Sequence, residues 1–305
     1  MPELPDVEAY GAALRPRVVD ATLQRVRVVG ISLLKSFDPP VDALEGCRCT
    51  GVRRLGKRIV LEFEDDGLYA VLHLMIAGRL RWREHGATVP RRLGLAALDW
   101  SRPGEATLDG GTLVITEAGT RKRASLHVER GRDALAGHDR GGIEPLHADR
   151  AAFVAELTRE NRTLKRALTD PRRFSGIGNA YSDEILHAAG LSPVQRTGNL
   201  DDAACTRLYE ATQTVLGSWT QRLTAEAAEA FPEKVTAFRP EFAVHGRYGE
   251  PCPVCGTTVQ RIRYAENETN YCPGCQTGGR LLADRGLSRL LKDDWPSHVD
   301  QLEGA

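Results

Sequence analysis

Short segments in which apolar and polar residues alternate, or form brief apolar runs, fill the first 120 residues. Alternation with a period of two is typical of a strand with one buried face. Glycine-rich or acidic turns, such as residues 64–67 and 109–111, separate the segments. This spacing predicts an antiparallel β-sandwich or barrel, with strands at residues 23–29, 51–55, 58–63, 69–74, 79–82 and 112–115.

A helical pattern precedes these strands. Apolar residues recur every three to four positions over residues 3–16, which places them on one face of a helix: Leu4, Val7, Tyr10 and Leu14. Proline lacks the amide hydrogen that continues a helix, so we expect Pro16 to end it.

The period becomes helical again after residue 149. Residues 131–148 carry glycines, charges and a proline and are interpreted as a linker. Beyond them the pattern predicts helices at residues 151–160, 163–169, 180–189 and 200–223. A glycine-bearing turn lies between two of these helices at residues 174–179. Such a turn can present backbone N–H groups to a phosphate, or it can simply join a helix hairpin.

Composition narrows the class of protein. The chain has 305 residues, 41% of them hydrophobic, and 41 basic residues balance 41 acidic ones. A net charge of zero argues neither for nor against nucleic acid, because only a local basic face could bind it. No apolar run approaches the length of a membrane span. Seven cysteines are an odd number for a disulfide framework, so we expect a reducing, cytoplasmic compartment.

Four of the cysteines have the spacing of a metal site. Cys252, Cys255, Cys272 and Cys275 form C-x2-C-x16-C-x2-C, in which each pair aims two sulfurs at one point. Four thiolates close the shell of a structural Zn²⁺ and leave no position for a reacting water. The intervening residues 257–264 alternate like one strand of a hairpin. The other cysteines, Cys47, Cys49 and Cys205, are interpreted as ordinary small side chains.

The N-terminus offers a candidate nucleophile. Removal of Met1 would expose the secondary amine of Pro2, and amines form Schiff bases with carbonyl carbons. The carboxylate of Glu3 is one residue away and could move the protons that this chemistry requires. Many chains begin with Met-Pro, so the alternative is an ordinary terminus that leads into a helix.

Four blocks of the sequence, in this order, carry a resemblance to a known family. The first is residues 2–8 (PELPDVE), and the second is residues 56–58 (GKR) with a strand pair that ends at residue 74. The third is residues 164–184, which end with the sequence GIGNAYSDE, and the fourth is residues 245–249 (HGRYG), followed by the cysteine finger and Gln276. Over residues 1–278 the chain resembles the formamidopyrimidine-DNA glycosylase / endonuclease VIII family.

The resemblance implies an α+β multidomain fold and base-excision repair. Its parts would be an N-terminal helix with an antiparallel β-sandwich (residues 1–130), a linker (131–148), a helix–two-turn–helix domain (149–235) and a zinc finger (236–280). The chain then continues as a C-terminal extension (281–305), whereas the family commonly ends soon after the finger. The implied activity is that of a DNA glycosylase and AP lyase on a damaged base, with oxidised bases as the expected class. The implied partner is double-stranded DNA with such a base or an abasic site. The protein would act as a monomer, associated with the nucleoid and not with a membrane.

The resemblance also assigns residues. Pro2 would attack the sugar carbon as the Schiff-base nucleophile, and Glu3 would be the proton donor. Lys57 would donate a proton or meet the phosphate beside the lesion. Asn179 and Lys165 would contact the DNA backbone in the helical domain.

The residues that expose the damaged base depart from the family pattern. Wedge side chains offset the cost of unstacking a base, and Ile76 stands where the family has a methionine. The following loop, residues 116–125, is longer than usual and has no phenylalanine, so Arg121 or Arg123 is the candidate for the family's arginine. The alternative for this loop is a solvated basic turn. These departures leave the lesion and the opposite base open.

The finger and the C-terminus also differ. Asn267 occupies the position of the family's phosphate-binding arginine, next to two carboxylates, so Arg261 and Arg263 on the adjacent strand are the candidate substitutes. The extension has a rough apolar face, formed by Leu281, Leu282, Leu287, Leu290 and Leu291, that we expect to dock on the protein itself; the alternative is a contact with a partner. The altered wedge and finger motivate an alternative function: a non-catalytic or weakly catalytic protein that binds damaged DNA.

Overall fold

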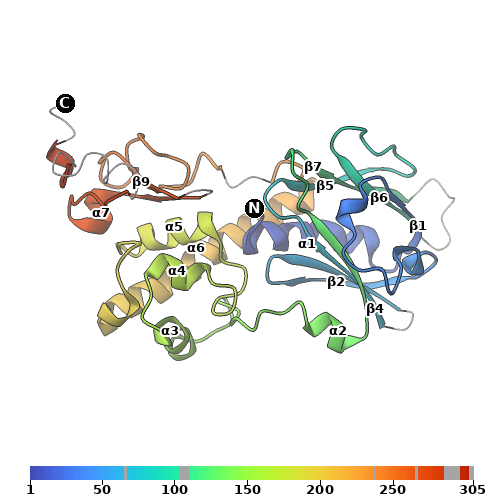
Figure 1. Cartoon of the computed structure of the whole chain (residues 1–305), viewed down its shortest axis with the longest axis horizontal. Coiled ribbons are helices and arrows are strands. Elements are labelled where there is room, and N and C mark those ends of the chain that lie inside the picture. Colours follow the sequence, from blue (N-terminus) through green and yellow to red (C-terminus); the bar gives the residue numbers. More distant parts are fainter. Residues whose placement is uncertain (65–66, 103–109, 236–237, 265–266, 285–295, 302–305) are drawn as a thin grey trace. The chain divides into compact units, whose positions relative to one another are not determined.

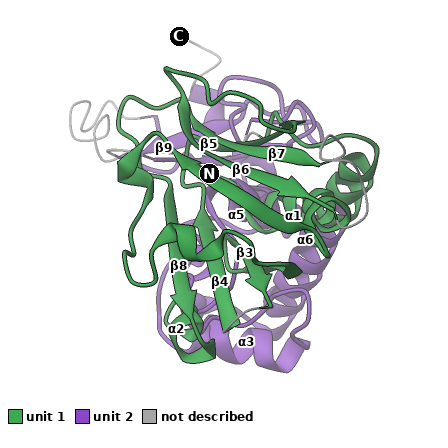
Figure 2. Cartoon of the chain, turned by 90° about the vertical axis from the view of Figure 1, so that its right-hand side faces the viewer, with its two compact units in different colours: residues 1–140, 219–236 green, residues 141–218, 237–305 purple. Residues whose placement is uncertain are grey.

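The computed structural model describes residues 1–64, 67–102, 110–235, 238–264, 267–284 and 296–301 (Figure 1). The chain forms two compact units (Figure 2). Residues 1–140 and 219–236 make up the first, and residues 141–218 and 237–305 make up the second. No helix among the described residues combines the length and the apolar character needed to cross a membrane.

Unit 1 contains two four-stranded antiparallel sheets. The first has the order β1 (Thr22–Val28), β6 (Gly94–Ser101), β7 (Gly111–Glu117), β5 (Gly78–Glu84). The second has the order β2 (Cys49–Leu55), β3 (Arg58–Phe63), β4 (Leu68–His73), β8 (Ser125–Arg130). Two 3₁₀ turns, η1 (Ile31–Leu33) and η2 (Val41–Leu44), and a short helix, α2 (Arg132–Ala136), complete its connections.

The alternation in β3 shows how the sequence places the core. Ile59 and Phe63 belong to the main hydrophobic cluster, whereas Val60 between them belongs to a small cluster on the opposite face. Phe63 stacks on Trp100 of β6, with ring centroids 6.1 Å apart, so the inner faces of the two sheets share one core. Burying a large apolar side chain contributes about 1.5–3 kcal/mol, and this core holds the sandwich together.

Helix α1 (Leu4–Val18) packs into the same core through the apolar face that the sequence predicted. The prediction that Pro16 ends the helix was wrong, because the helix continues to Val18. Pro16 lies in the last turn, where a missing amide removes only one hydrogen bond. The end of helix α6 (Asp202–Glu229) packs on α1, with Ala9 and Ala13 against Leu223 and Ala227.

Two strands and one helix of unit 1 were not predicted from the sequence. Strand β6 is buried along nearly its whole length, so it reads as a continuous apolar run without alternation. Strand β8 is short and carries a histidine and charges on its exposed positions. Helix α2 lies within the stretch interpreted as a linker, and its Leu135 packs on Val60 and Val71.

Unit 2 is mostly helical, with a small β-hairpin. Its elements are α3 (Arg150–Thr158), α4 (Leu164–Thr169), α5 (Asn179–Ala188), η4 (Thr197–Asn199), the first part of α6, β9 (Gln260–Arg263), β10 (Glu268–Tyr271), α7 (Pro273–Thr277) and η6 (Val299–Gln301). Phe153 and Phe174 meet in its core with ring centroids 4.8 Å apart. The hairpin predicted between the cysteine pairs is present as β9 and β10.

The described part of the C-terminal extension lies against the hairpin. The amide of Leu282 donates to the Tyr271 hydroxyl at 2.8 Å, and the carboxylate of Asp284 accepts from the Arg263 amide at 2.6 Å. Leu281 is buried. The predicted contacts of Leu287, Leu290 and Leu291 lie outside the described residues.

Candidate active site and nucleic-acid interface

Pro2 and Glu3 lie at the start of helix α1, and both are buried. Glu3 is the N-cap residue, and its amide donates to the Asp6 carboxylate at 2.9 Å. The Glu3 side chain and the Asp6 amide are the reciprocal pair of a capping box. This arrangement fixes the Glu3 carboxylate at the helix terminus, one residue after Pro2, and leaves Glu3 only 2% exposed.

Lys57 lies in the tight turn between β2 and β3, after Gly56, which has φ +60. Arg54 anchors this turn, because its guanidinium donates to the Gly56 carbonyl at 2.9 Å and to the Glu8 carboxylate at 2.8 Å. Glu8 belongs to helix α1. The Arg54–Glu8 pair therefore ties the turn that carries Lys57 to the helix that begins next to Glu3.

The electrostatics of the N-terminus favour a neutral amine. Burial lowers the pKa of the α-amino group of Met1, and the cations of Arg79 and Lys57 lower it further, while Glu3 and Asp6 act in the opposite direction. Arg79 on β5 had no signal in the sequence, and the structure adds it to the predicted group of Pro2, Glu3 and Lys57.

His73 ends β4 and pairs across the sheet with Arg58. Burial lowers the pKa of His73 to about 4, and the charges of Arg58 and Lys57 contribute to the shift. The imidazole is therefore neutral at physiological pH.

The loop between β4 and β5 presents Ile76 to solvent. Met75 has φ 52, an unusual conformation for a residue with a side chain. The turn closes tightly through the Gly78 amide, which donates to the Leu74 carbonyl at 2.9 Å. Ile76 at its tip is 55% exposed, although it is a large apolar side chain. Arg79 donates to the Ile76 carbonyl at 3.2 Å and so supports this exposed position.

The loop that follows β7 carries Arg121 and Arg123. The buried carboxylate of Glu117 accepts from the amides of Arg123 and Ala124 at 2.9–3.1 Å and shapes the loop from within. The Arg121 side chain is exposed. The Ala118 amide donates to the Ala77 carbonyl at 3.3 Å, so this loop lies beside the one that carries Ile76. The structure thus brings both candidate wedge segments together.

In unit 2, Lys165 lies against the glycine turn. Its ammonium group donates to the Asn179 carbonyl at 2.6 Å and to the Asp183 carboxylate at 2.5 Å. The side-chain amide of Asn179, the first residue of α5, donates to the Glu268 carbonyl in the hairpin at 2.8 Å. The two predicted backbone-contacting residues therefore lie together, and Asn179 also links the turn to β10.

Sequence reasoning missed the acidic residues that organise this region. Asp183 accepts from Lys165 and contacts Nδ1 of His245 at 2.7 Å. The buried carboxylate of Glu184 accepts from the amides of residues 243, 244 and 245 at 2.7–3.0 Å. Burial raises the pKa of Glu184, while these amides favour its charged form. Both residues lie in a motif that the sequence showed, but their long-range partners could not be read from it.

The four predicted zinc ligands converge. Sγ of Cys255 lies 3.3 Å from Sγ of Cys272, and Sγ of Cys252 lies 3.9 Å from Sγ of Cys275. Four thiolates about 2.3 Å from Zn²⁺ in a tetrahedron would be about 3.8 Å apart, so the arrangement fits the ion. The four cysteines form a structural zinc site that holds the hairpin together.

His187 on α5 is an additional residue of this centre. Its Nε2 lies 3.3 Å from Sγ of Cys252, and both side chains are buried. Burial lowers the pKa of His187, so the ring is neutral and keeps one N–H that can donate to the thiolate. The hydrogen bond connects the helix that follows the glycine turn to the zinc centre.

The two candidate arginines of the hairpin differ in their side-chain contacts and exposure. The guanidinium of Arg261 lies over the Tyr248 ring, 4.1 Å from its centroid, and 3.4 Å from the Glu268 carboxylate. Arg263 is exposed. The carbonyl of Asn267 accepts from the Tyr264 amide at 2.7 Å. Glu268 thus has a cation beside it, while Glu266 lies outside the described residues.

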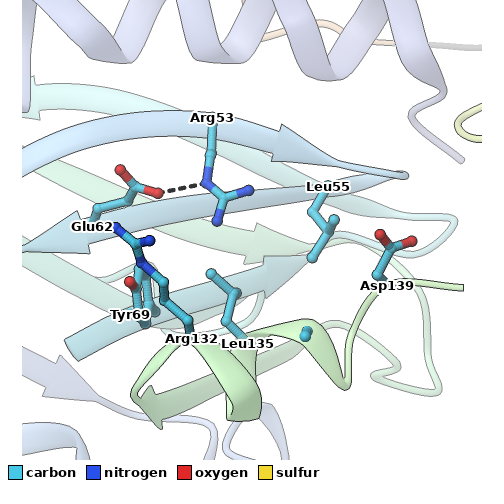
Figure 3. A pocket seen from close by; sticks show the side chains of 8 residues that line it. Arg53, Leu55, Glu62, Tyr69, Arg132, Leu135 and Asp139 are labelled. Atoms are coloured by element: carbon cyan, nitrogen blue, oxygen red, sulfur yellow. Dashed lines mark hydrogen bonds and ion pairs between the residues drawn. The ribbon is translucent and has the colours of Figure 1, made fainter. Parts of the chain in front are cut away.

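A pocket of about 430 Å³ occurs elsewhere on unit 1 (Figure 3). It lies between helix α2 and the face of the second sheet that points away from the main core. Leu55, Tyr69 and Leu135 form its apolar part, and the Arg53–Glu62 ion pair lies on the strands beside it. The pocket contains none of the predicted site residues.

Profiles of three domain families match the sequence. The formamidopyrimidine-DNA glycosylase N-terminal domain matches residues 1–177, and the formamidopyrimidine-DNA glycosylase H2TH domain matches residues 142–223. The zinc finger found in FPG and IleRS matches residues 249–278.

Individual proteins are similar over most of the chain. A formamidopyrimidine-DNA glycosylase of Heliobacterium modesticaldum is 32% identical over 289 residues, which cover 90% of this chain and 100% of that protein. A Mycobacterium tuberculosis protein described as an uncharacterized formamidopyrimidine-DNA glycosylase-like protein is 48% identical over 152 residues, which cover 50% of this chain and 94% of that protein. The fold is similar to that of Lactococcus lactis Fpg in a complex with abasic-site DNA, with a TM-score of 0.76 and 23% identity over 90% of this chain and 99% of that one.

Proposed function

The chain belongs to the formamidopyrimidine-DNA glycosylase family, and we propose that it is a base-excision-repair glycosylase with AP-lyase activity. Its substrate is double-stranded DNA that contains a damaged base, with oxidised bases as the first class to test, or an abasic site. The observation that supports the proposal is the buried Glu3 carboxylate, which is the N-cap of α1 and follows Pro2 in the chain.

Pro2 acts as the nucleophile after removal of Met1. Glu3 donates a proton to the ring oxygen of the sugar, and the bond from C1′ to that oxygen breaks while the Pro2 nitrogen forms a bond to C1′. The base then leaves with the electron pair of its bond to C1′ and takes up the proton that the Pro2 nitrogen releases, which gives an iminium ion. The iminium makes the C2′ proton acidic, the Glu3 carboxylate takes that proton, and the 3′ phosphate leaves, which cuts the strand.

The remaining residues bind and expose the substrate. Lys57 contacts the phosphate beside the lesion, and Lys165 and Asn179 contact the DNA backbone. Ile76 enters the duplex where the damaged base leaves the stack, with Arg121 or Arg123 on the adjacent loop. Arg263 and Arg261 supply positive charge from the hairpin. The zinc ion maintains the shape of the hairpin, and no step of the reaction passes through it.

Borohydride trapping on abasic-site DNA tests the proposal. Reduction of the iminium leaves a stable covalent complex of protein and DNA. We expect the natural chain to be trapped and Pro2→Gly to lose trapping. Pro5→Ala, three residues further along, serves as the matched control and should retain it. Absence of trapping by the natural chain would contradict the enzymatic proposal.

The exposed Ile76 and the finger with asparagine at position 267 support a second candidate function. On this alternative the chain binds damaged DNA with little or no catalysis. Gel-shift assays with abasic-site and undamaged duplexes distinguish the two. Selective binding of the damaged duplex without cleavage or trapping would favour the alternative.

A further inference from the structure

Two histidines and a glutamate converge on unit 1, apart from the proposed active site. Nε2 of His138 lies 2.8 Å from a carboxylate oxygen of Glu129, and Nδ1 of His127 lies 3.8 Å from the same oxygen. The two imidazole rings meet edge to face, with centroids 4.7 Å apart. One potential ligand atom from each of the three side chains falls within 4.8 Å of the other two.

The fold preorganises this group. His127 and Glu129 alternate with Val128 on β8, and because Val128 belongs to the core, its two neighbours point to the opposite face. Helix α2 docks on that face through Leu135. The chain turns after α2, where the His138 amide donates to the Leu135 carbonyl at 3.0 Å. This turn places the His138 side chain next to Glu129.

The ligand types indicate a class of metal. Two imidazoles with one carboxylate suit divalent transition metals such as Zn²⁺, Cu²⁺, Ni²⁺ and Fe²⁺, whereas Mg²⁺ and Ca²⁺ prefer oxygen ligands. The three side chains are only 14–27% exposed, so each loses little further freedom on binding. Two facts weaken the site relative to the four-thiolate centre. The described residues supply only three protein ligands, and the cations of Arg58 and Lys35 act on His127.

We propose that His127, Glu129 and His138 form a second metal site, which binds a divalent transition metal less tightly than the cysteine centre. Bound metal joins β8 to the segment that follows α2. That segment includes Asp139, and α2 itself forms one side of the pocket in Figure 3. The site therefore stabilises the part of unit 1 where the chain continues into unit 2. It has no ligand in common with the zinc finger.

Cobalt titration of the full-length protein, with zinc already in the finger, tests the site. Nitrogen and oxygen ligands give Co²⁺ only visible d–d bands, whereas thiolates add intense ultraviolet charge-transfer bands. We expect the natural chain to bind one further equivalent at micromolar Co²⁺ without charge-transfer bands. His127→Asn, Glu129→Gln and His138→Asn should each weaken this binding at least tenfold. His147→Asn, an exposed histidine outside the cluster, is the matched control and should bind as the natural chain does.

Hydrogen exchange provides a readout that does not depend on the variants. Addition of Zn²⁺ to the zinc-loaded natural chain should slow exchange in residues 132–140. No further equivalent up to 0.1 mM metal, or one that all three variants retain, would overturn the proposal. Charge-transfer bands alone would also overturn it, because they would place the added metal at the cysteines.

Discussion

Two regions of unit 1 differ in burial and in how they are held in place. One is the start of helix α1, and the other is the pair of loops at residues 74–78 and 118–124. Glu3 is 2% exposed and is fixed by a capping box, whereas Ile76 is 55% exposed at the tip of a turn. The proposed chemical group follows from residues adjacent in sequence and from the geometry of a helix terminus. The loops depend on long-range contacts such as the amide of Ala118 with the carbonyl of Ala77. The proposed chemical group is therefore encoded more locally than the loops proposed to expose the base.

The largest effect should come from Glu3→Gln. Glutamine keeps the shape of the side chain but cannot donate the proton, and general acid–base catalysis contributes typically 10²–10⁴-fold. We expect base excision to fall by about two orders of magnitude or more, while affinity for abasic-site DNA changes less than about threefold. Single-turnover excision and gel-shift titration measure the two quantities. Glu84→Gln, an exposed carboxylate on β5, is the control, and equal losses of excision and binding would indicate a structural role.

Arg54→Ala tests whether the turn with Lys57 is held against α1. Only 8% of the Arg54 side chain is exposed, and the substitution leaves Glu8 without this partner. Breaking a fully buried ion pair costs about 3–5 kcal/mol. For this partly buried pair we expect the free energy of unfolding to fall by about 2 kcal/mol. We also expect a reduced rate of strand cleavage. Arg53→Ala breaks an exposed pair with Glu62 and should cost less than about 1 kcal/mol. Urea unfolding compares the variants, and equal losses would contradict the anchoring role.

Ile76→Ala should separate base exposure from chemistry. Unstacking a base costs a few kcal/mol, which a wedge side chain helps to offset. We expect excision of a damaged base to fall about tenfold, while cleavage of a preformed abasic site changes less than about twofold. Ile31→Ala, also exposed on unit 1, should affect neither rate. A parallel loss of both rates would place Ile76 in the chemical step.

The last prediction concerns pH. The pKa of His73 is about 4 in the folded protein and near 6.5 when unfolded, so between these values the unfolded chain binds more protons. This group therefore lowers stability as the pH falls from 6.5 to 4, by up to about 1.4 kcal/mol per pH unit. His73→Gln should reduce the loss of unfolding free energy between pH 6.5 and 4.5. An unchanged pH dependence would show that His73 titrates normally.

The sequence predicts the elements whose pattern is local. Helix α1, the alternating strands and the cysteine hairpin follow from periodicity and spacing. Strand β6 was not predicted, because burial on both faces removes the alternation of apolar and polar residues. Arg79 and Asp183 were not identified, because their importance depends on partners that are distant in sequence. The sequence identified Pro2, Glu3 and Lys57 as candidate site residues. The Arg54–Glu8 contact that connects their elements could be found only from the structure.

Mass spectrometry of the borohydride-trapped complex tests the central claim most directly. After digestion of the DNA and the protein, we predict that the sugar remnant is attached to an N-terminal peptide that lacks Met1 and begins at Pro2. Attachment to Lys57 or to any other lysine, with an unmodified N-terminal peptide, would contradict the account.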